Sequence, residues 1–131
     1  MTANSPKTRR DKGKKFEIEI AKDLRESGLD KEARRMPCSG ALEDLKADLI
    51  TSLPIHFECK RVEKLNLYDA YLQAESGRKQ QEMAIVVHKK SHKPKMAYLK
   101  WSDLIQIMVL AKESGGLLPQ YGFQKRKQVN K

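Results

Sequence analysis

The sequence predicts an α/β fold in which helices flank a mixed central β-sheet. The first observation is the order of patterned segments along the 131-residue chain: a helix, three strands, a helix, two strands and a last helix. The second is the continuous apolar run at 83–87, which is typical of a strand buried on both faces. The length suits one domain. We place it at 12–116, between a flexible basic arm at 1–11 and a basic tail at 117–131.

The first helix is predicted over 13–27 and ends near Gly28, a residue suited to the left-handed position after a helix. Its apolar stripe consists of Phe16, Ile20, Ala21 and Leu24. Glu17 lies inside this stripe. A carboxylate on an inward face needs a partner or a metal. A lysine or arginine at the edge of the stripe is the simpler partner, and both alternatives stay open.

Two strands are predicted next, at 46–50 and 56–62, after a short edge strand at 32–38. Residues two apart in a strand share a face, so Glu58 and Lys60 point the same way. Pairing of the two strands across the turn at 51–54 would put Asp48 beside Glu58. Carboxylate oxygens suit Mg²⁺ or Mn²⁺. A metal with an adjacent ammonium suits attack of water on a phosphodiester. Asp44 is a rival to Asp48, less favoured because it precedes the strand.

The remaining elements are a helix at 68–80, strands at 83–87 and 96–99, and a helix at 103–113 capped by Ser102 with Asp103 in its first turn. Gln73 and Gln80 fall on the helix at 68–80, where a solvent-facing position is favoured over a polar role at the active site. The last helix is apolar on more than one side. It is either a core helix or a dimer interface.

The net charge of the chain indicates the kind of partner that it binds. Lysine and arginine total 27 against 17 acidic residues, a net charge of +10. Such an excess implies an anionic partner, and nucleic acid fits better than a membrane because no basic helix carries a bulky apolar face. No Gly-rich phosphate loop favours a small nucleotide substrate. The two cysteines, Cys38 and Cys59, form neither a disulfide framework nor a zinc site. With no signal peptide or membrane span in the pattern, we expect a cytoplasmic protein.

An ordered set of motifs resembles the PD-(D/E)XK nuclease superfamily. It comprises Lys12-Gly13 opening the first helix, Glu17 four residues after the glycine, Ser39-Gly40, Asp48 and Glu58-Cys59-Lys60. Within the superfamily, the chain is most similar to archaeal-type Holliday junction resolvases, including phage versions. The resemblance covers roughly residues 12–100 and implies a restriction-endonuclease-like core. One departure is Ala47 where the family places proline, and another is the short spacing from Asp48 to Glu58.

The resemblance implies a role for each matched residue. Asp48 and Glu58 would bind Mg²⁺, for which Mn²⁺ could substitute, with the Cys59 carbonyl as a further ligand and Glu17 completing the acidic cluster. Lys60 would orient or help deprotonate the attacking water, and Ser39 would bind a phosphate. The DNA-binding residues we expect are Lys12, Lys14, Lys15, Arg34, Arg35, Arg61, Arg78 and Lys79. A homodimer would nick opposed strands of a four-way junction and leave 5′-phosphate ends.

Three functions are compatible with these patterns. The first is a metal-dependent, structure-selective endonuclease that resolves Holliday junctions, acting near the nucleoid or in the cytoplasm of a phage-infected host. The second is a related nuclease in repair or recombination with another DNA target. The third is a non-catalytic module that binds branched DNA. The complete set of acids and lysine argues against the third.

Overall fold

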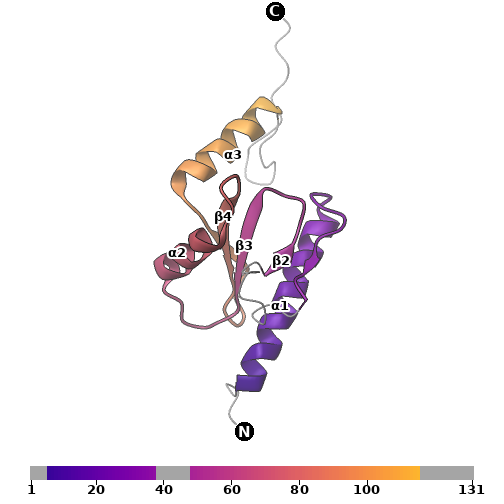
Figure 1. The fold of residues 1–131 in the computed structure, drawn as a ribbon, viewed down its shortest axis with the longest axis vertical. Helices are drawn as coiled ribbons and strands as arrows, with labels where there is room; N and C mark the ends of the chain where they lie inside the picture. Colours follow the sequence, from indigo (N-terminus) through magenta and orange to yellow (C-terminus); the bar gives the residue numbers. More distant parts are fainter. Residues whose placement is uncertain (1–5, 38–47, 116–131) are drawn as a thin grey trace, which may run out of the picture. The chain divides into compact units, whose positions relative to one another are not determined.

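The computed structural model describes residues 6–37 and 48–115 (Figure 1). The chain forms two compact units, divided between Leu99 and Lys100, and each is described by itself. The order of elements along the chain is the predicted one. The first unit contains α1, β1, β2, β3, α2, β4 and β5, and the second contains α3. The predicted domain limits of 12 and 116 stay a prediction, and the tail from 117 lies outside the described residues.

Helix α1 (Pro6–Glu26) begins earlier than the predicted start at residue 13, so that start is wrong. Part of the expected flexible arm, residues 6–11, is helical. The reason is local: proline suits the first helical position, and lysine and arginine are strong helix formers. The predicted end is confirmed, since Gly28 follows the helix with a φ of 82°.

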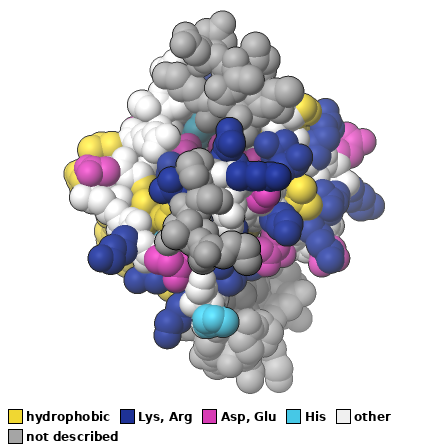
Figure 2. All heavy atoms as spheres, turned by 90° about the horizontal axis from the view of Figure 1, so that it is seen from below, with side chains coloured by type: hydrophobic (Ala, Val, Ile, Leu, Met, Phe, Trp, Pro, Cys, Tyr) yellow, Lys and Arg dark blue, Asp and Glu magenta, His cyan; other side chains and the backbone are white. Residues whose placement is uncertain are grey.

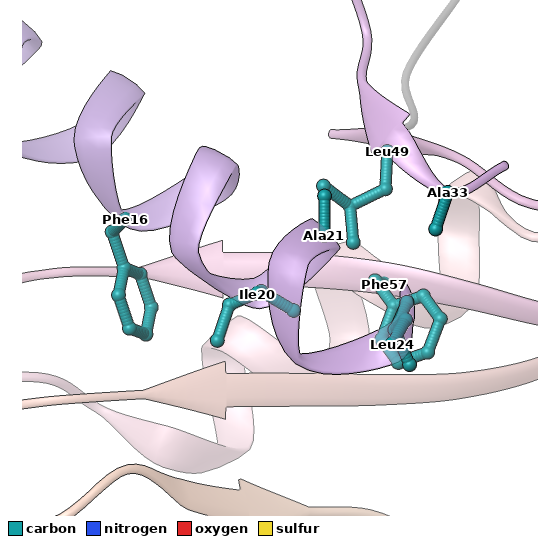
Figure 3. Close-up of a cluster of buried hydrophobic side chains, with 7 residues drawn as sticks. All are labelled: Phe16, Ile20, Ala21, Leu24, Ala33, Leu49 and Phe57. Atoms are coloured by element: carbon teal, nitrogen blue, oxygen red, sulfur yellow. The ribbon is translucent and has the colours of Figure 1, made fainter. Parts of the chain in front are cut away.

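The apolar stripe of α1 forms one side of the main core (Figure 3). Phe16, Ile20, Ala21 and Leu24 pack with Ala33, Leu49 and Phe57. All seven side chains are less than 9% exposed. The stripe predicted from the sequence is therefore confirmed, and it fixes α1 over the face of β3 that carries Phe57.

The main sheet is mixed, as expected for an α/β fold of the restriction-endonuclease-like type. Strand β3 (Ile55–Lys60) pairs in parallel with β4 (Met83–His88), and β4 pairs antiparallel with β5 (Met96–Tyr98). The strand order β3-β4-β5 leaves β3 at an edge of this sheet. Strand β4 alternates between buried and half-buried residues, so the prediction that it is buried on both faces is wrong. Its less buried face packs only at the margin of the α1 core.

The predicted hairpin between the strands at 46–50 and 56–62 is also wrong in the described residues. Strand β2 (Leu49–Ile50) pairs antiparallel with β1 (Arg34–Arg35) instead of with β3. The connection after β2 is held elsewhere: the hydroxyl of Thr51 and the backbone N–H of Ser52 both donate to Asp30, in the loop after α1. These bonds hold the connection to the loop after α1.

Helix α2 (Leu67–Gly77) connects β3 to β4 and covers the opposite face of the sheet from α1 (Figure 1). Asn66 caps it by accepting the N–H of Asp69 at 3.0 Å. Ala70, Tyr71 and Ala74 pack on Ala84 and Val86 in a second core cluster. The helix ends at Gly77, before the predicted residue 80, so Gln80 lies outside it. The side chain of Arg78 donates to three carbonyls of the segment that follows the helix.

Helix α3 (Trp101–Glu113) begins at Trp101, with Lys100 in the capping position. The prediction that Ser102 is the cap is wrong, because the Lys100 carbonyl already accepts the N–H groups of Asp103 and Leu104. Asp103 does lie in the first turn. No residue of α3 is buried, so its role as a core helix or a dimer interface stays open. Among the described helices, none combines the length and the apolar character that a membrane span requires.

Candidate active site

The candidate site is centred on the C-terminal half of β3. Glu58 and Lys60 lie on the same face of the strand, as the two-residue period predicts. Their charged groups are in contact, with 3.3 Å between Glu58 Oε1 and Lys60 Nζ. The Glu58 side chain is 8% exposed and that of Lys60 is 25% exposed. The Lys60 side chain is therefore partly exposed to solvent, whereas the Glu58 side chain is buried.

Asp48 reaches the same place from the start of β2. Its Oδ2 accepts the backbone N–H of Cys59 at 2.7 Å. Because β3 is an edge strand, this N–H lacks a neighbouring strand on that side, and the carboxylate takes the place of one. The structure thus brings Asp48 next to Glu58 through a side-chain contact rather than through a hairpin.

Glu17 arrives from α1 and is bound by an arginine. Arg35 Nε donates to Glu17 Oε2 at 2.7 Å, and the glutamate side chain is only 12% exposed. Of the two alternatives for this inward carboxylate, a basic partner is the one observed. The partner comes from β1, 18 residues away in the sequence.

The three carboxyl groups repel one another electrostatically. Burial, followed by the charge of Asp48, raises the pKa of Glu58 to about 7, against the opposing effect of Lys60. Burial also raises the pKa of Asp48, although the N–H of Cys59 acts to lower it. Burial and the charge of Asp48 raise the pKa of Glu17. Buried acids that raise one another's pKa are characteristic of functional sites.

A divalent cation would relieve this repulsion, and the donors are the hard oxygens that Mg²⁺ and Mn²⁺ prefer. Asp48 and Glu58 therefore fit such an ion. Within residues 6–37 and 48–115, however, no group of three His, Cys, Asp or Glu side chains stands ready to bind one. Glu17, the predicted third acid, is engaged by Arg35. Burial raises the pKa of the Cys59 thiol above its usual range, so this thiol stays protonated.

Lys60 has a second partner, which corresponds to the less favoured of the two predictions for Gln73. The side-chain oxygen of Gln73, on α2, accepts a hydrogen bond from Lys60 Nζ at 3.0 Å. Gln73 is exposed, as expected, but it is not simply a solvent-facing residue. The signal for it was weak: a polar residue on the helix that follows β3. Gln80 shares that signal, yet it lies beyond the helix and is exposed.

His56 is a residue that the sequence did not single out. It lies two residues before Glu58 in β3 and is 4% exposed. Its Nε2 is buried and has no hydrogen-bond partner among the described residues. Burial lowers the pKa of His56, while Glu82 and Asp48 act to raise it. His56 is therefore a buried, neutral side chain two residues from Glu58.

The predicted DNA-binding residues fall into two groups. Arg35, Arg61 and Arg78 are engaged by acidic side chains of the protein. Lys14, Lys15, Arg34 and Lys79 are exposed, and Lys12 is half-buried. Figure 2 shows Lys and Arg side chains, in dark blue, spread over one face with acidic side chains between them. Cys38, Ser39 and Asp44 lie outside the described residues.

Comparison with known proteins supplies one match. A family model described as "Phage putative PDDEXK endonuclease" matches residues 8–111, which include every element from α1 to most of α3. No curated protein matches the chain, and no solved structure matches it.

Proposed function

The chain belongs to the phage PDDEXK endonuclease family, and from this premise we propose that it is a metal-dependent endonuclease that resolves four-way DNA junctions. Membership makes it a nuclease of the PD-(D/E)XK type, with DNA as the substrate. The observation that carries the proposal is the convergence of Asp48, Glu58 and Lys60 at the end of β3. The choice of junctions rests on the resemblance of Lys12-Gly13, Glu17 and the small basic chain to junction resolvases.

Asp48 and Glu58 would hold Mg²⁺ or Mn²⁺, with the Cys59 carbonyl as a further ligand and Glu17 at the edge of the cluster. When bound, the ion would lower the pKa of water and offset charge on the phosphate. Lys60 would orient the attacking water and stabilise the negative charge that develops on the phosphoryl oxygens. Gln73 would hold the ammonium in place through its 3.0 Å hydrogen bond. Ser39 would bind a phosphate oxygen.

The reaction is hydrolysis of a phosphodiester. The water oxygen forms a bond to phosphorus while the bond from phosphorus to the 3′-oxygen breaks. The proton lost by the attacking water goes to solvent or to a neighbouring base, and the 3′-oxygen takes up a proton from solvent and leaves as a hydroxyl. The products are a 5′-phosphate and a 3′-hydroxyl. Two copies of the chain in a homodimer would cut opposed strands of a junction, in the cytoplasm of a phage-infected cell.

The test compares a four-way junction with a linear duplex of the same sequence, each with Mg²⁺ and with EDTA. Lys60→Met removes the ammonium and keeps much of the side chain, and we expect it to slow cutting by a factor on the order of 10²–10³. The matched control is Lys64→Met, the same change at an exposed lysine in the following loop.

Paired nicks in the junction alone, lost with EDTA and in Lys60→Met, are the expected result. Equal cutting of both substrates would keep the nuclease and replace the junction by another DNA target. Full activity of Lys60→Met would overturn the assignment of the site. Tight junction binding by the wild type without any cutting would leave a binding module.

A further inference from the structure

A pocket separate from the acidic cluster lies between the start of α1 and the loop after β3. It has a volume of about 220 Å³ and is lined by Arg9, Lys12, Arg61, Val62 and Glu63. This volume is several times the roughly 30 Å³ of one water molecule in the liquid, so the pocket can accommodate a phosphate group. Three of the five lining residues are cations and one is an acid.

The acid offsets only one of the three cations, because Glu63 is paired with Arg61 and not with Arg9 or Lys12. Glu63 Oε2 accepts from Arg61 Nη1 at 3.1 Å and from the N–H of Ser91 at 3.0 Å. The hydroxyl of Ser91 donates to the same carboxylate at 3.2 Å. The N–H of Ser91 is the largest cause of the lowered pKa of Glu63, which is therefore fully ionised and bonded.

These contacts also hold the wall of the pocket in place. Arg61 Nη2 donates to Ser91 Oγ at 3.3 Å, and His88 Nε2 lies 2.8 Å from the carbonyl oxygen of Val62. The loop at 61–63 is thus fixed to the end of β4 and the segment after it. A guanidinium held in this way presents its remaining donors in a set direction.

The other wall supplies two cations that make no ion pair with the described residues. Arg9 and Lys12 are three residues apart on α1, so they lie on one face of the helix. Arg9 lies in the first turn, which contains no acid, and Lys12 lies in the second, which contains Asp11. Cations near a helix N-terminus are unfavourable, because that end carries a partial positive charge. An anion bound in the pocket would remove this unfavourable interaction.

We propose that this pocket binds one backbone phosphodiester of the DNA strand, next to the phosphate that is cut. The inference deepens the proposed nuclease function and rests on it for the nature of the ligand. Arg61 directly follows Lys60 in the chain, and adjacent Cα atoms are about 3.8 Å apart. The wall of the pocket thus continues directly from β3, so the phosphate in the pocket would belong to the same stretch of DNA as the one at Lys60 and would help to set the position of the cut.

The test uses binding in EDTA, so that no strand is cut. A four-way junction is prepared with one neutral methylphosphonate at a time, moved along the strand around the cleavage position. Binding is measured for the wild type, for Arg9→Gln, for Lys12→Gln and for both changes together. The matched control is Arg10→Gln, an exposed arginine next to Arg9 that does not line the pocket.

At one position, we expect a methylphosphonate to weaken DNA binding by the wild type roughly tenfold and by the double variant less than twofold. The reason is that the neutral phosphate and the protein substitutions remove the same contact. The double variant should also reduce the salt slope of binding by about one. Arg10→Gln should retain the wild-type sensitivity at that position. Thermal melts of each variant check that the fold is kept.

Equal sensitivity of wild type and double variant at every position would overturn the inference, as would an Arg10→Gln that behaves like Arg9→Gln. By coupling we mean that a methylphosphonate weakens binding of the wild type more than that of the double variant. Coupling found only at a 5′-terminal phosphate would also overturn the inference, because the pocket would then bind strand ends. The binding test does not depend on cutting. If the protein shows this coupling but never cuts DNA, only the nuclease proposal is refuted. If it cuts DNA without this coupling, only the proposal for the pocket is refuted.

Discussion

Two carboxylates of similar burial behave in opposite ways in this molecule. Asp30, in the loop after α1, is 8% exposed, and Glu58, in β3, is 6% exposed. The pKa of Asp30 falls to about 2, whereas that of Glu58 rises to about 7. For Glu58, burial is the largest cause and raises the pKa, whereas for Asp30 hydrogen bonds to the carboxylate outweigh burial and lower it.

Asp30 is surrounded by hydrogen-bond donors. Its carboxylate accepts the N–H of Ser52 at 2.8 Å, the hydroxyl of Thr51 at 2.8 Å and the N–H of Glu32 at 3.0 Å. The N–H of Ser52 is the largest cause of its lowered pKa. The bonds from Thr51 and Ser52 join two loops that are more than 20 residues apart, so Asp30 stabilises the fold.

Glu58 has one cation near it and two acids. Lys60 lies 3.3 Å away, while the charges of Asp48 and Glu17 oppose its ionisation. At neutral pH this arrangement destabilises the folded chain. Functional sites often lower the stability of the folded protein in this way. Here the cause is Glu58, a buried acid with too few hydrogen-bond donors around it.

The largest effect should come from Glu58→Gln, which makes the side chain permanently neutral. Cutting should fall by a factor on the order of 10³, because a ligand for the metal is lost. In EDTA the variant should be more stable than wild type above pH 7, by on the order of 1–3 kcal/mol. The folded pKa lies above the ordinary 4.5, so this gain should appear as the pH rises from about 4.5 to about 7.

Thermal unfolding across this pH range measures the effect. Addition of Mg²⁺ at pH 8 should raise the melting temperature of the wild type and leave that of Glu58→Gln nearly unchanged. A variant that is less stable than wild type at pH 8 in EDTA would contradict the electrostatic account of Glu58.

Asp30→Asn should act on stability in the opposite direction. It removes a charged acceptor of three hydrogen bonds and should lower the melting temperature by roughly 5–10 °C at pH 7. The folded pKa is below the ordinary value, so the stabilisation is present above about pH 4 and lost as the pH falls toward 2. The gap between variant and wild type should close over that range. Cutting per folded molecule should be unchanged below the melting transition, and a specific loss of cutting would place Asp30 in the site.

Gln73→Ala should have the smallest effect of the three. Lys60 would keep its contact with Glu58 and lose the acceptor at 3.0 Å. We expect the rate of cutting to fall roughly tenfold with little change in DNA affinity, since Gln73 positions another residue. Gln80→Ala, an exposed glutamine beyond the helix, is the matched control. Equal rates for Gln73→Ala and wild type would show that the hydrogen bond plays no part in the reaction.

The features that depend on periodicity and composition could be predicted from the residues alone. The helical stripe of α1, the shared face of Glu58 and Lys60, the order of the elements and the excess of positive charge all follow from the residues and their spacing. These features are local, because backbone geometry alone relates residues two, three or four positions apart.

The contacts between residues far apart in the chain could not be predicted in this way. Asp48 reaches Glu58 through the N–H of Cys59 and not through a hairpin, and Asp30 binds the intervening loop. Arg35 pairs with Glu17, and Gln73 pairs with Lys60, across 18 and 13 residues. Such contacts depend on how separate elements pack, and many residues of the same type were equally available in the sequence. The packing of α1, β2 and α2 around β3 selects among them.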